Sequence, residues 1–346
     1  MHRRAFLTGS IATSTALALG LSTAAYPQPA GRKPAALQTG DEVRLVAPAG
    51  AIFERVRFEI AAENMEGLGL KPTFGEHARE RHGYLAGTDA ERAADLMAAF
   101  RDPNVKAIFA LTGGWGAART LAHLDFDVIR ANPKVVIGYS DITSLLNAIY
   151  AQTGIPTFHG PNGTSRWRPA VVTAAKQILF EGHAPLIKNP VPNHDTLAQH
   201  DLRVQTIVPG SAEGVLVGGN LTVLTALAGS PYMPDMNGKI LFLEDIGEAI
   251  YRVDRMLSTL ELSGALGQLS GIVFGGFTRV GNDGDGYGAF ALMDIFDRYC
   301  KKAGVPAFYG APFGHIAGNR IMPVGTRARI DASAGTIQLL EPSVRT

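Results

Sequence analysis

The chain has 346 residues, of which 46% are hydrophobic and 18% are charged, a length that fits about two domains. Its 32 lysines and arginines nearly balance its 31 aspartates and glutamates, so the formal net charge is only +1. This composition excludes a disordered or collagen-like chain, and the charge balance gives no reason to expect nucleic acid as a partner. The single cysteine, Cys300, excludes an internal disulfide.

The first residues have the pattern of an export signal. Arg3 and Arg4 precede a mildly apolar stretch over residues 11–21, as in a bacterial twin-arginine signal, which carries folded cargo. We expect residues 1–25 to be removed on export to the periplasm and residues 26–40 to form a linker. The apolar stretch is shorter than the roughly 20 residues that a membrane span needs, so we expect no stable span after cleavage. A disordered cytosolic tail and an uncleaved anchor are the alternatives.

From residue 42 onward, short apolar runs alternate with amphipathic segments, which predicts an α/β fold with mainly parallel sheets. A capping box at Thr88 and Glu91 predicts the start of one helix. The expected strands are 43–47, 107–111, 135–137, 214–217, 239–243, 271–274, 328–331 and 336–340. The expected helices are 88–100, 141–150, 248–262 and 290–302.

One segment interrupts this alternation. Residues 186–202 lie in a region that is rich in Pro, His and Asn and has no clear period. We therefore predict an N-terminal domain over 41–185, an inter-domain linker over 186–202 and a C-terminal domain over 203–346.

A serine follows the expected strand 135–137 at a sharp turn. The chain runs through Gly138 and Tyr139 into Ser140, and a helix is expected to begin at once at Asp141. Such a turn lifts the serine hydroxyl out of the sheet and places the Asp141 N–H at a helix N-terminus, where negative charge is stabilised. The alternative is a serine that only caps the helix.

Glycines follow the preceding strand, at Gly113 and Gly114, with Trp115 next to them. Their N–H groups and that of Asp141 could together form an oxyanion hole, although a tight turn would also require glycine. The glycine spacing matches neither a dinucleotide fingerprint nor a P-loop, so we expect no nucleotide cofactor.

A nucleophilic serine needs a base, and the base needs a carboxylate that fixes its tautomer. Glu244 follows the expected strand 239–243, and His315 follows a glycine-containing loop, so Ser140, Glu244 and His315 could supply these groups. The alternatives are an acid that interacts only with a helix dipole and a solvated histidine.

Several short motifs together resemble the LD-carboxypeptidase family of serine peptidases. In chain order they are Thr112-Gly113-Gly114-Trp115-Gly116, Gly138-Tyr139-Ser140-Asp141, His159-Gly160-Pro161, Gly218-Gly219-Asn220, Leu243-Glu244-Asp245 and Gly314-His315. The resemblance implies a flavodoxin-like N-terminal domain, a smaller C-terminal α/β domain, an active site between them and a homodimer. It assigns Ser140 as nucleophile, His315 as base, Glu244 as its partner, and the N–H groups of Gly113, Gly114 and Asp141 as the oxyanion hole.

The family reaction would release the terminal D-Ala from a murein tetrapeptide, with no metal and no other cofactor. The substrate carboxylate calls for a cation, for which Arg166 and Arg168 are candidates, and Trp115 is a further candidate for substrate binding. Two other functions stay open: hydrolysis of peptide-nucleotide antibiotics of the microcin C type, and a non-catalytic periplasmic peptide-binding protein.

Overall fold

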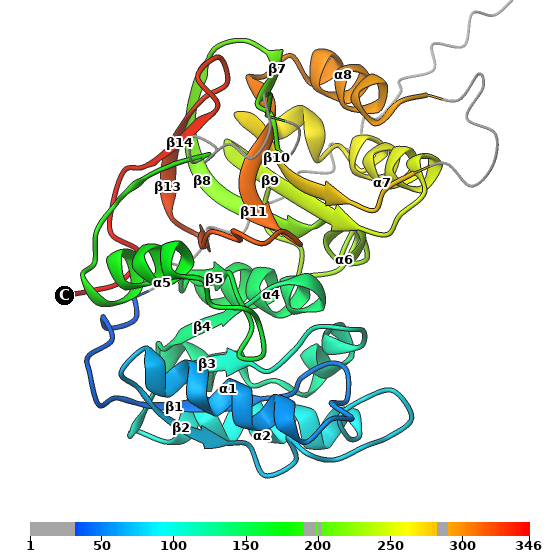
Figure 1. The fold of residues 1–346 in the computed structure, drawn as a ribbon. Coiled ribbons are helices and arrows are strands. Elements are labelled where there is room, and N and C mark those ends of the chain that lie inside the picture. Colours follow the sequence, from blue (N-terminus) through cyan, green and yellow to red (C-terminus); the bar gives the residue numbers. More distant parts are fainter. Residues whose placement is uncertain (1–31, 190–197, 200–201, 282–289) are drawn as a thin grey trace, which may run out of the picture.

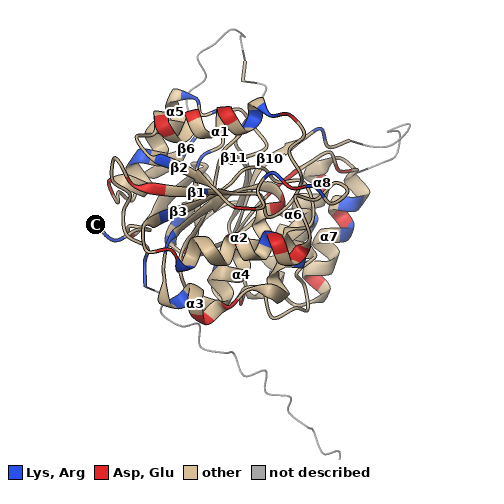
Figure 2. Cartoon of the chain, turned by 90° about the horizontal axis from the view of Figure 1, so that it is seen from below, with Lys and Arg blue, Asp and Glu red and all other residues tan. Residues whose placement is uncertain are grey.

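The computed structural model describes residues 32–189, 198–199, 202–281 and 290–346 (Figure 1). The predicted export signal over residues 1–25 lies outside the described residues. Two sheets, one above the other in Figure 1, divide the molecule into two α/β halves. No helix in the described ranges is long and apolar enough to cross a membrane. Acidic and basic residues are both scattered over the face seen in Figure 2, in keeping with the balanced charge.

The first sheet has six strands in the order β12-β5-β4-β3-β1-β2. Five of them are parallel and come from the N-terminal half, whereas β12 is antiparallel to β5. The strands are β1 (Glu42–Val46), β2 (Lys71–Phe74), β3 (Val105–Ala110), β4 (Val135–Gly138), β5 (Thr157–His159) and β12 (Met322–Val324).

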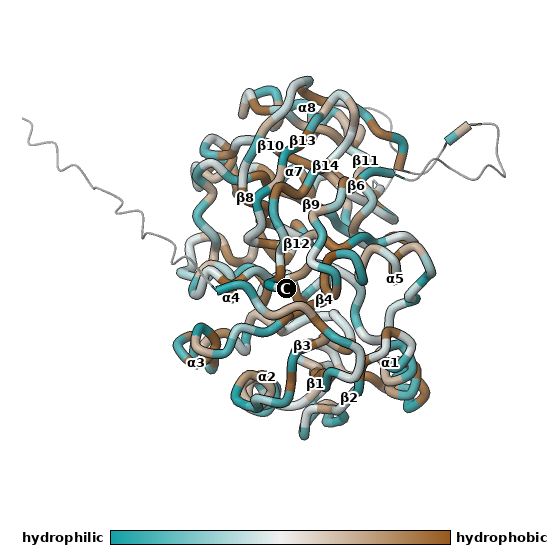
Figure 3. Tube along the Cα trace, turned by 90° about the vertical axis from the view of Figure 1, so that its left-hand side faces the viewer, coloured by the Kyte–Doolittle hydropathy of each residue, from teal (hydrophilic) through white to brown (hydrophobic). Residues whose placement is uncertain are grey.

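Helices cover both faces of this sheet. In Figure 3, α1 and α5 lie on one side of it, and α2, α3 and α4 lie on the other. These helices are α1 (Val56–Gly67), α2 (Asp89–Arg101), α3 (Phe126–Ala131), α4 (Thr143–Thr153) and α5 (Pro169–Ala175), which continues into a π-helical turn (Lys176–Phe180). The 3-10 helix η1 (Ala117–His123) follows the glycine loop after β3.

The second sheet has eight strands in the order β6-β14-β13-β8-β9-β10-β11-β7. Its centre, β8 to β11, is parallel, and antiparallel strands flank it on both sides. The strands are β6 (Leu186–Lys188), β7 (Gln205–Val208), β8 (Ser211–Asn220), β9 (Lys239–Ile246), β10 (Gly271–Thr278), β11 (Ala307–Gly314), β13 (Arg327–Asp331) and β14 (Thr336–Leu339). The helices of this half are α6 (Leu221–Thr225), α7 (Ile250–Leu262), α8 (Leu292–Ala303) and the 3-10 turn η4 (Leu266–Gln268).

All eight predicted strands and all four predicted helices are confirmed, with ends that differ by a few residues. The capping box is present, since the Thr88 hydroxyl accepts from the Glu91 N–H and the Glu91 carboxylate accepts from the Thr88 N–H. The predicted loop before His315 is wrong, because residues 307–314 form β11, which pairs with β10 across a bulge. Its two glycines and its proline hid a strand that lies between β10 and the edge strand β7.

The two predicted linkers carry more structure than their composition indicates. β6, at the start of the predicted linker over 186–202, is an edge strand paired with β14, while residues 190–197 and 200–201 of that linker lie outside the described part. In the linker predicted over 26–40, Leu37 is buried, and Lys33 forms an ion pair with Glu341 at 2.7 Å. These residues therefore pack against the C-terminal end of the chain.

Buried hydrogen bonds between α4 and β8 join the two halves. Asn147 donates to the Gly218 carbonyl at 2.8 Å and accepts from the Gly218 N–H at 3.2 Å. The Thr143 hydroxyl accepts from the Asn220 N–H at 3.0 Å. Since buried polar groups must be satisfied, this contact fixes the helix that follows Ser140 against the strand beside β9.

Candidate active site

Ser140 lies at a strained turn directly after β4. Its φ of 65° is in the left-handed region, where a side chain is disfavoured, by about 1–3 kcal/mol in such functional positions. A 3-10 turn (Ser140–Ile142) leads from it into α4. The side chain of Asn162 accepts from the Tyr139 N–H at 3.2 Å and so supports the turn from the opposite side.

The glycine loop after β3 packs directly against this serine. A Cβ atom at Gly113 would lie 2.8 Å from the Ser140 Cβ and 3.0 Å from its Oγ, so only glycine fits there. The Gly113 carbonyl accepts from the Gly50 N–H at 3.1 Å, which holds the loop. Within the described ranges, no acceptor is hydrogen-bonded to the N–H groups of Gly113, Gly114 or Asp141. The three N–H groups predicted to form the oxyanion hole therefore have no hydrogen-bond partner among these residues.

The carboxylate of Asp141 has a separate structural role. It is buried and accepts from the Ala117 N–H at 2.7 Å, which ties the turn after β4 to the start of η1. Burial raises the pKa of Asp141 above its ordinary value, although the hydrogen bond from Ala117 opposes this shift.

Glu244 and His315 meet at the ends of β9 and β11. The Glu244 Oε2 lies 2.6 Å from the Nδ1 of His315 and accepts from the His315 N–H at 3.1 Å. Gly314 permits this approach: its φ is 104°, and a Cβ there would lie 2.6 Å from the Glu244 Cβ. The carboxylate thus fixes both the backbone and the ring of His315 and leaves Nε2 as the other ring nitrogen.

Glu244 is completely buried. Burial alone would raise its pKa, but the side chains of His159 and His315, which face the carboxylate, outweigh this effect and lower the pKa to about 2. Glu244 is therefore an anion at neutral pH. The next residue behaves differently, since burial raises the pKa of Asp245 to about 6.

Tyr139 connects the serine to the histidine. Its ring centre is 4.8 Å from that of His315, and Ser140 is the next residue. No hydrogen bond between the Ser140 hydroxyl and His315 is present in the described part of the chain. The structure thus brings Glu244 and His315 into direct contact, and it packs Tyr139, the residue before Ser140, against the His315 ring.

Both predicted arginines line a cavity of about 380 Å³ that His315 also lines. Between them, the Trp167 ring turns inward and donates from Nε1 to the Asn162 carbonyl at 3.1 Å. Arg166 and Arg168 are exposed, and neither forms an ion pair with a residue that the structure describes. Two unpaired cations therefore flank the space beside His315.

Trp115 does not line this cavity. It is 54% exposed, and its ring meets that of Tyr84 edge to face at 5.9 Å. Arg119, a further cation on the 3-10 helix η1, forms an ion pair with Asp89 at 2.9 Å. Trp115 and Tyr84 form an exposed aromatic pair at the end of the glycine loop.

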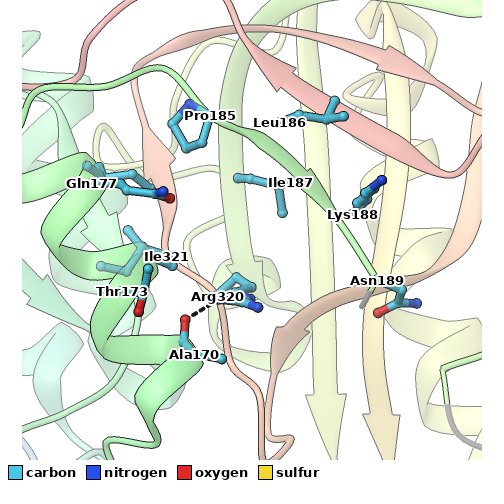
Figure 4. Close-up of a pocket in the computed structure, with 12 residues that line it drawn as sticks. Ala170, Thr173, Gln177, Pro185, Leu186, Ile187, Lys188, Asn189, Arg320 and Ile321 are labelled. Atoms are coloured by element: carbon cyan, nitrogen blue, oxygen red, sulfur yellow. Dashed lines mark hydrogen bonds between the residues drawn. The ribbon is translucent and has the colours of Figure 1, made fainter. Parts of the chain in front are cut away.

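A second cavity shares lining residues with the first, and a third shares lining residues with the second. One, of about 670 Å³, is lined by His315, Arg320 and Asn189 among others. The next, of about 460 Å³, lies between α5 and β6, where Arg320 donates to the Ala170 carbonyl (Figure 4). Hollow space therefore continues from His315 toward β6.

Sequence reasoning gave no role to three buried polar residues of this region. Asn162 supports the Tyr139 backbone, Asn220 donates to Asp245 at 2.9 Å, and His159 lies 3.7 Å from Glu244. His159 and Asn220 lie in motifs that carry the family resemblance, and these motifs could have indicated that both residues belong to the site. Asn162 follows β5, which at three residues is too short to recognise from hydrophobic pattern.

The fold and the site define a two-domain α/β protein, with a serine in one half and a paired glutamate and histidine in the other. Residues 43–160 match the LD-carboxypeptidase N-terminal domain, and residues 213–330 match the LD-carboxypeptidase C-terminal domain. The chain belongs to the LD-carboxypeptidase family and is a peptidase.

Individual relatives are similar over nearly their whole length. A probable murein peptide carboxypeptidase of Bacillus subtilis is 38% identical over 312 residues, which are 88% of this chain and 93% of the relative. The murein tetrapeptide carboxypeptidase of Pseudomonas aeruginosa is 35% identical over 295 residues, which are 84% of this chain and 93% of the relative.

The solved structure of MccF in complex with glutamyl sulfamoyl guanosine is also similar. It superposes with a TM-score of 0.81 at 26% identity and covers 92% of this chain and 100% of its own. MccF is a microcin C7 self-immunity protein. The predicted α/β fold with two domains therefore agrees with the known structures of the family.

We predict that Gly314→Ala destabilises the protein more than Gly304→Ala does. Both glycines have positive φ, but a Cβ at Gly304 meets nothing within 4 Å, whereas one at Gly314 meets Glu244. Gly304→Ala therefore incurs only backbone strain, while Gly314→Ala adds an overlap that costs about 1–3 kcal/mol more. Urea unfolding of both variants measures the difference. Equal losses would contradict the packing of Gly314 on Glu244.

Proposed function

We propose that this protein is a serine-type LD-carboxypeptidase that releases the terminal D-Ala from murein tetrapeptides. One observation carries the proposal: a serine with a strained backbone lies beside backbone N–H groups without acceptors, and its neighbour Tyr139 packs against a histidine that a buried carboxylate holds. This arrangement supplies each group that acyl transfer requires. The murein peptide carboxypeptidases among the relatives support the choice of substrate.

In this mechanism the Ser140 hydroxyl attacks the carbonyl that precedes D-Ala, and His315 Nε2 takes its proton. Glu244 orients the imidazole through Nδ1 and stabilises its positive charge. The N–H groups of Gly113, Gly114 and Asp141 receive the developing oxyanion. His315 then protonates the amine of the leaving D-Ala, and water hydrolyses the acyl-enzyme by the reverse route. Ser140 and His315 must approach within hydrogen-bond distance when substrate binds.

The substrate carboxylate is placed in the cavity beside His315. Arg166 and Arg168 flank that cavity, and guanidinium groups bind carboxylates in bidentate fashion. We also propose that the exposed ring of Trp115 contacts the rest of the substrate.

The first experiment is mass spectrometry of a murein tetrapeptide incubated with the protein. We expect the wild type to release one alanine and Ser140→Ala to be slower by a factor of about 10⁴ or more, because the nucleophile is lost. Ser333→Ala, on the exposed turn between β13 and β14, is the control and should match the wild type. If Ser140→Ala keeps the wild-type rate, Ser140 is not the nucleophile.

The same assay addresses the second candidate function. The similarity to MccF favours hydrolysis of aminoacyl sulfamoyl nucleosides related to the ligand in that structure. Release of the amino acid from such a compound, with no loss of alanine from the tetrapeptide, would show that the protein acts on this class of compound and not on murein peptides. Covalent labelling of Ser140 by a fluorophosphonate would count against a non-catalytic peptide-binding protein.

For the arginines we expect an effect on binding more than on chemistry. Arg166→Ala and Arg168→Ala should each raise KM about tenfold or more with a smaller change in kcat, because each removes a cation that meets the substrate carboxylate. Arg298→Ala, an exposed arginine on α8, is the control. An unchanged KM in the Arg166→Ala, Arg168→Ala double variant would show that the substrate carboxylate does not bind in this cavity.

The proposal also includes a periplasmic homodimer that reaches this compartment through the twin-arginine signal of residues 1–25. We expect the processed protein in the periplasmic fraction of a bacterial host, and retention of the precursor in the cytoplasm after Arg3→Lys, Arg4→Lys substitution. Immunoblots of the two fractions measure this distribution. An unprocessed wild-type chain in the cytoplasm would contradict the signal.

A further inference from the structure

A second histidine, His159, faces the carboxylate that holds His315. It is the last residue of β5, and its side chain is completely buried. Its Nε2 lies 3.7 Å from the Glu244 Oε1, the oxygen that His315 does not use. The mechanism described above gives this residue no role.

Polar atoms on both sides of this gap lack partners. The structure describes five buried side-chain nitrogen and oxygen atoms without a hydrogen bond, and three of them are the Nδ1 and Nε2 of His159 and the Oε1 of Glu244. An unpaired polar group in the interior is costly, and an unpaired charged oxygen is more so. A closing movement of about 0.8 Å would bring the pair to the usual hydrogen-bond distance of about 2.9 Å.

The surroundings of His159 otherwise suit an apolar side chain. Its ring lies among those of Tyr139, Phe242 and Phe313, at centroid distances of 6.1, 5.7 and 6.3 Å. A Cβ at Gly219 would lie 3.1 Å from its Cδ2, so the site is also closed from the side of β8. Phenylalanine would satisfy the packing alone, whereas Glu244, a neighbour with an unpaired oxygen, calls for a donor.

The environment also selects the tautomer. With the proton on Nε2, the imidazole offers a donor to Glu244 and leaves only a bare acceptor at Nδ1. With the proton on Nδ1, a buried donor has no partner and the lone pair of Nε2 faces a carboxylate oxygen. The first arrangement has the lower cost.

We propose that His159 is a positioning residue of the active site, whose Nε2–H holds the second oxygen of Glu244 while the first oxygen holds His315. The carboxylate is then fixed by one histidine on each oxygen, and it cannot rotate away from His315. His159 is too deeply buried to touch substrate, so it acts only through Glu244. The role rests on the proposed function, in which Glu244 and His315 act on the Ser140 hydroxyl.

Loss of this donor should change the pH dependence in one direction. Without the Nε2–H of His159, the Glu244 anion has one donor fewer and interacts more strongly with His315. The imidazolium form of His315 then becomes easier to form. The acid limb of kcat/KM then moves to higher pH. The other titratable groups near this pair are Tyr139, whose ring packs between the two histidines, and Asp245, which turns away from Glu244 to the side chains of Asn220 and Thr222.

Three substitutions separate the donor from the packing. In His159→Gln the amide nitrogen takes the place of Nε2, in His159→Asn it takes the place of Nδ1, and His159→Phe keeps the ring without a donor. We expect the Phe and Asn variants to lose about ten- to a hundredfold in kcat on the tetrapeptide with little change in KM, as for a hydrogen bond to a charged group. The Gln variant should stay within about threefold of the wild type with an unshifted acid limb.

Phe242→Leu is the packing control, because it loosens the aromatic cage and leaves every donor in place. If His159→Phe loses no more than Phe242→Leu, or loses activity without moving the acid limb, His159 is a packing residue and the proposal fails.

Nitrogen-15 NMR of histidine-labelled wild-type protein tests the proposal without any measurement of activity. We expect His159 to have a proton on Nε2, and its signals are assigned by their absence from the spectrum of His159→Gln. A proton on Nδ1 alone would overturn the proposal. A wild type that releases no alanine would refute the proposed function instead, and the NMR result would still decide the position of the His159 proton.

Discussion

The hydrogen bonds between Asn147 of α4 and Gly218 of β8 hold the two halves of the active site in one frame. The helix that contains Asn147 begins directly after Ser140, and β8 places Asn220 in register with Glu244 on β9. A single buried amide therefore relates the serine of one sheet to the carboxylate of the other. Because the bonds are made to backbone atoms, the register of β8 and the position of α4 cannot change independently.

Each half also has a residue with an unusual backbone conformation at the active site. In the N-terminal half Ser140 has a left-handed backbone, supported by the side chain of Asn162. In the C-terminal half the chain reaches positive φ at Gly314, and the absence of a side chain there lets Glu244 contact the next residue. Ser140 itself has the strained backbone, whereas at His315 the positive φ falls on the preceding glycine, Gly314, where it causes little strain. The surrounding structure therefore determines both turns.

The sequence was most informative where hydrophobic runs were long. β1, β3, β4, β9 and β10 and the capping box at Thr88 follow from local pattern, as does the sharp turn at Ser140. β5 and β12, with three residues each, carry no readable period, and β11 is obscured by its glycines and its proline. The contact between Glu244 and His315 spans 71 positions, and local periodicity says nothing about which strand ends meet. The pair was suggested because a nucleophilic serine needs a base and a carboxylate, and the family resemblance then assigned it. His159 stood in a quoted motif, but its neighbourhood depends on three strands from two sheets.

The pairing of β12 with β5 has a consequence for the order in which the molecule is made. β12 places Met322 opposite His159, so the edge of the N-terminal sheet stays open until residues near the C-terminus have left the ribosome. At about 5–20 residues per second, the delay between these two positions is on the order of ten seconds or more. During that interval β5 has no outer neighbour, and for nearly all of it His315 has not yet been synthesised. The nascent N-terminal half therefore passes through translation with an unpaired strand edge and no assembled active site.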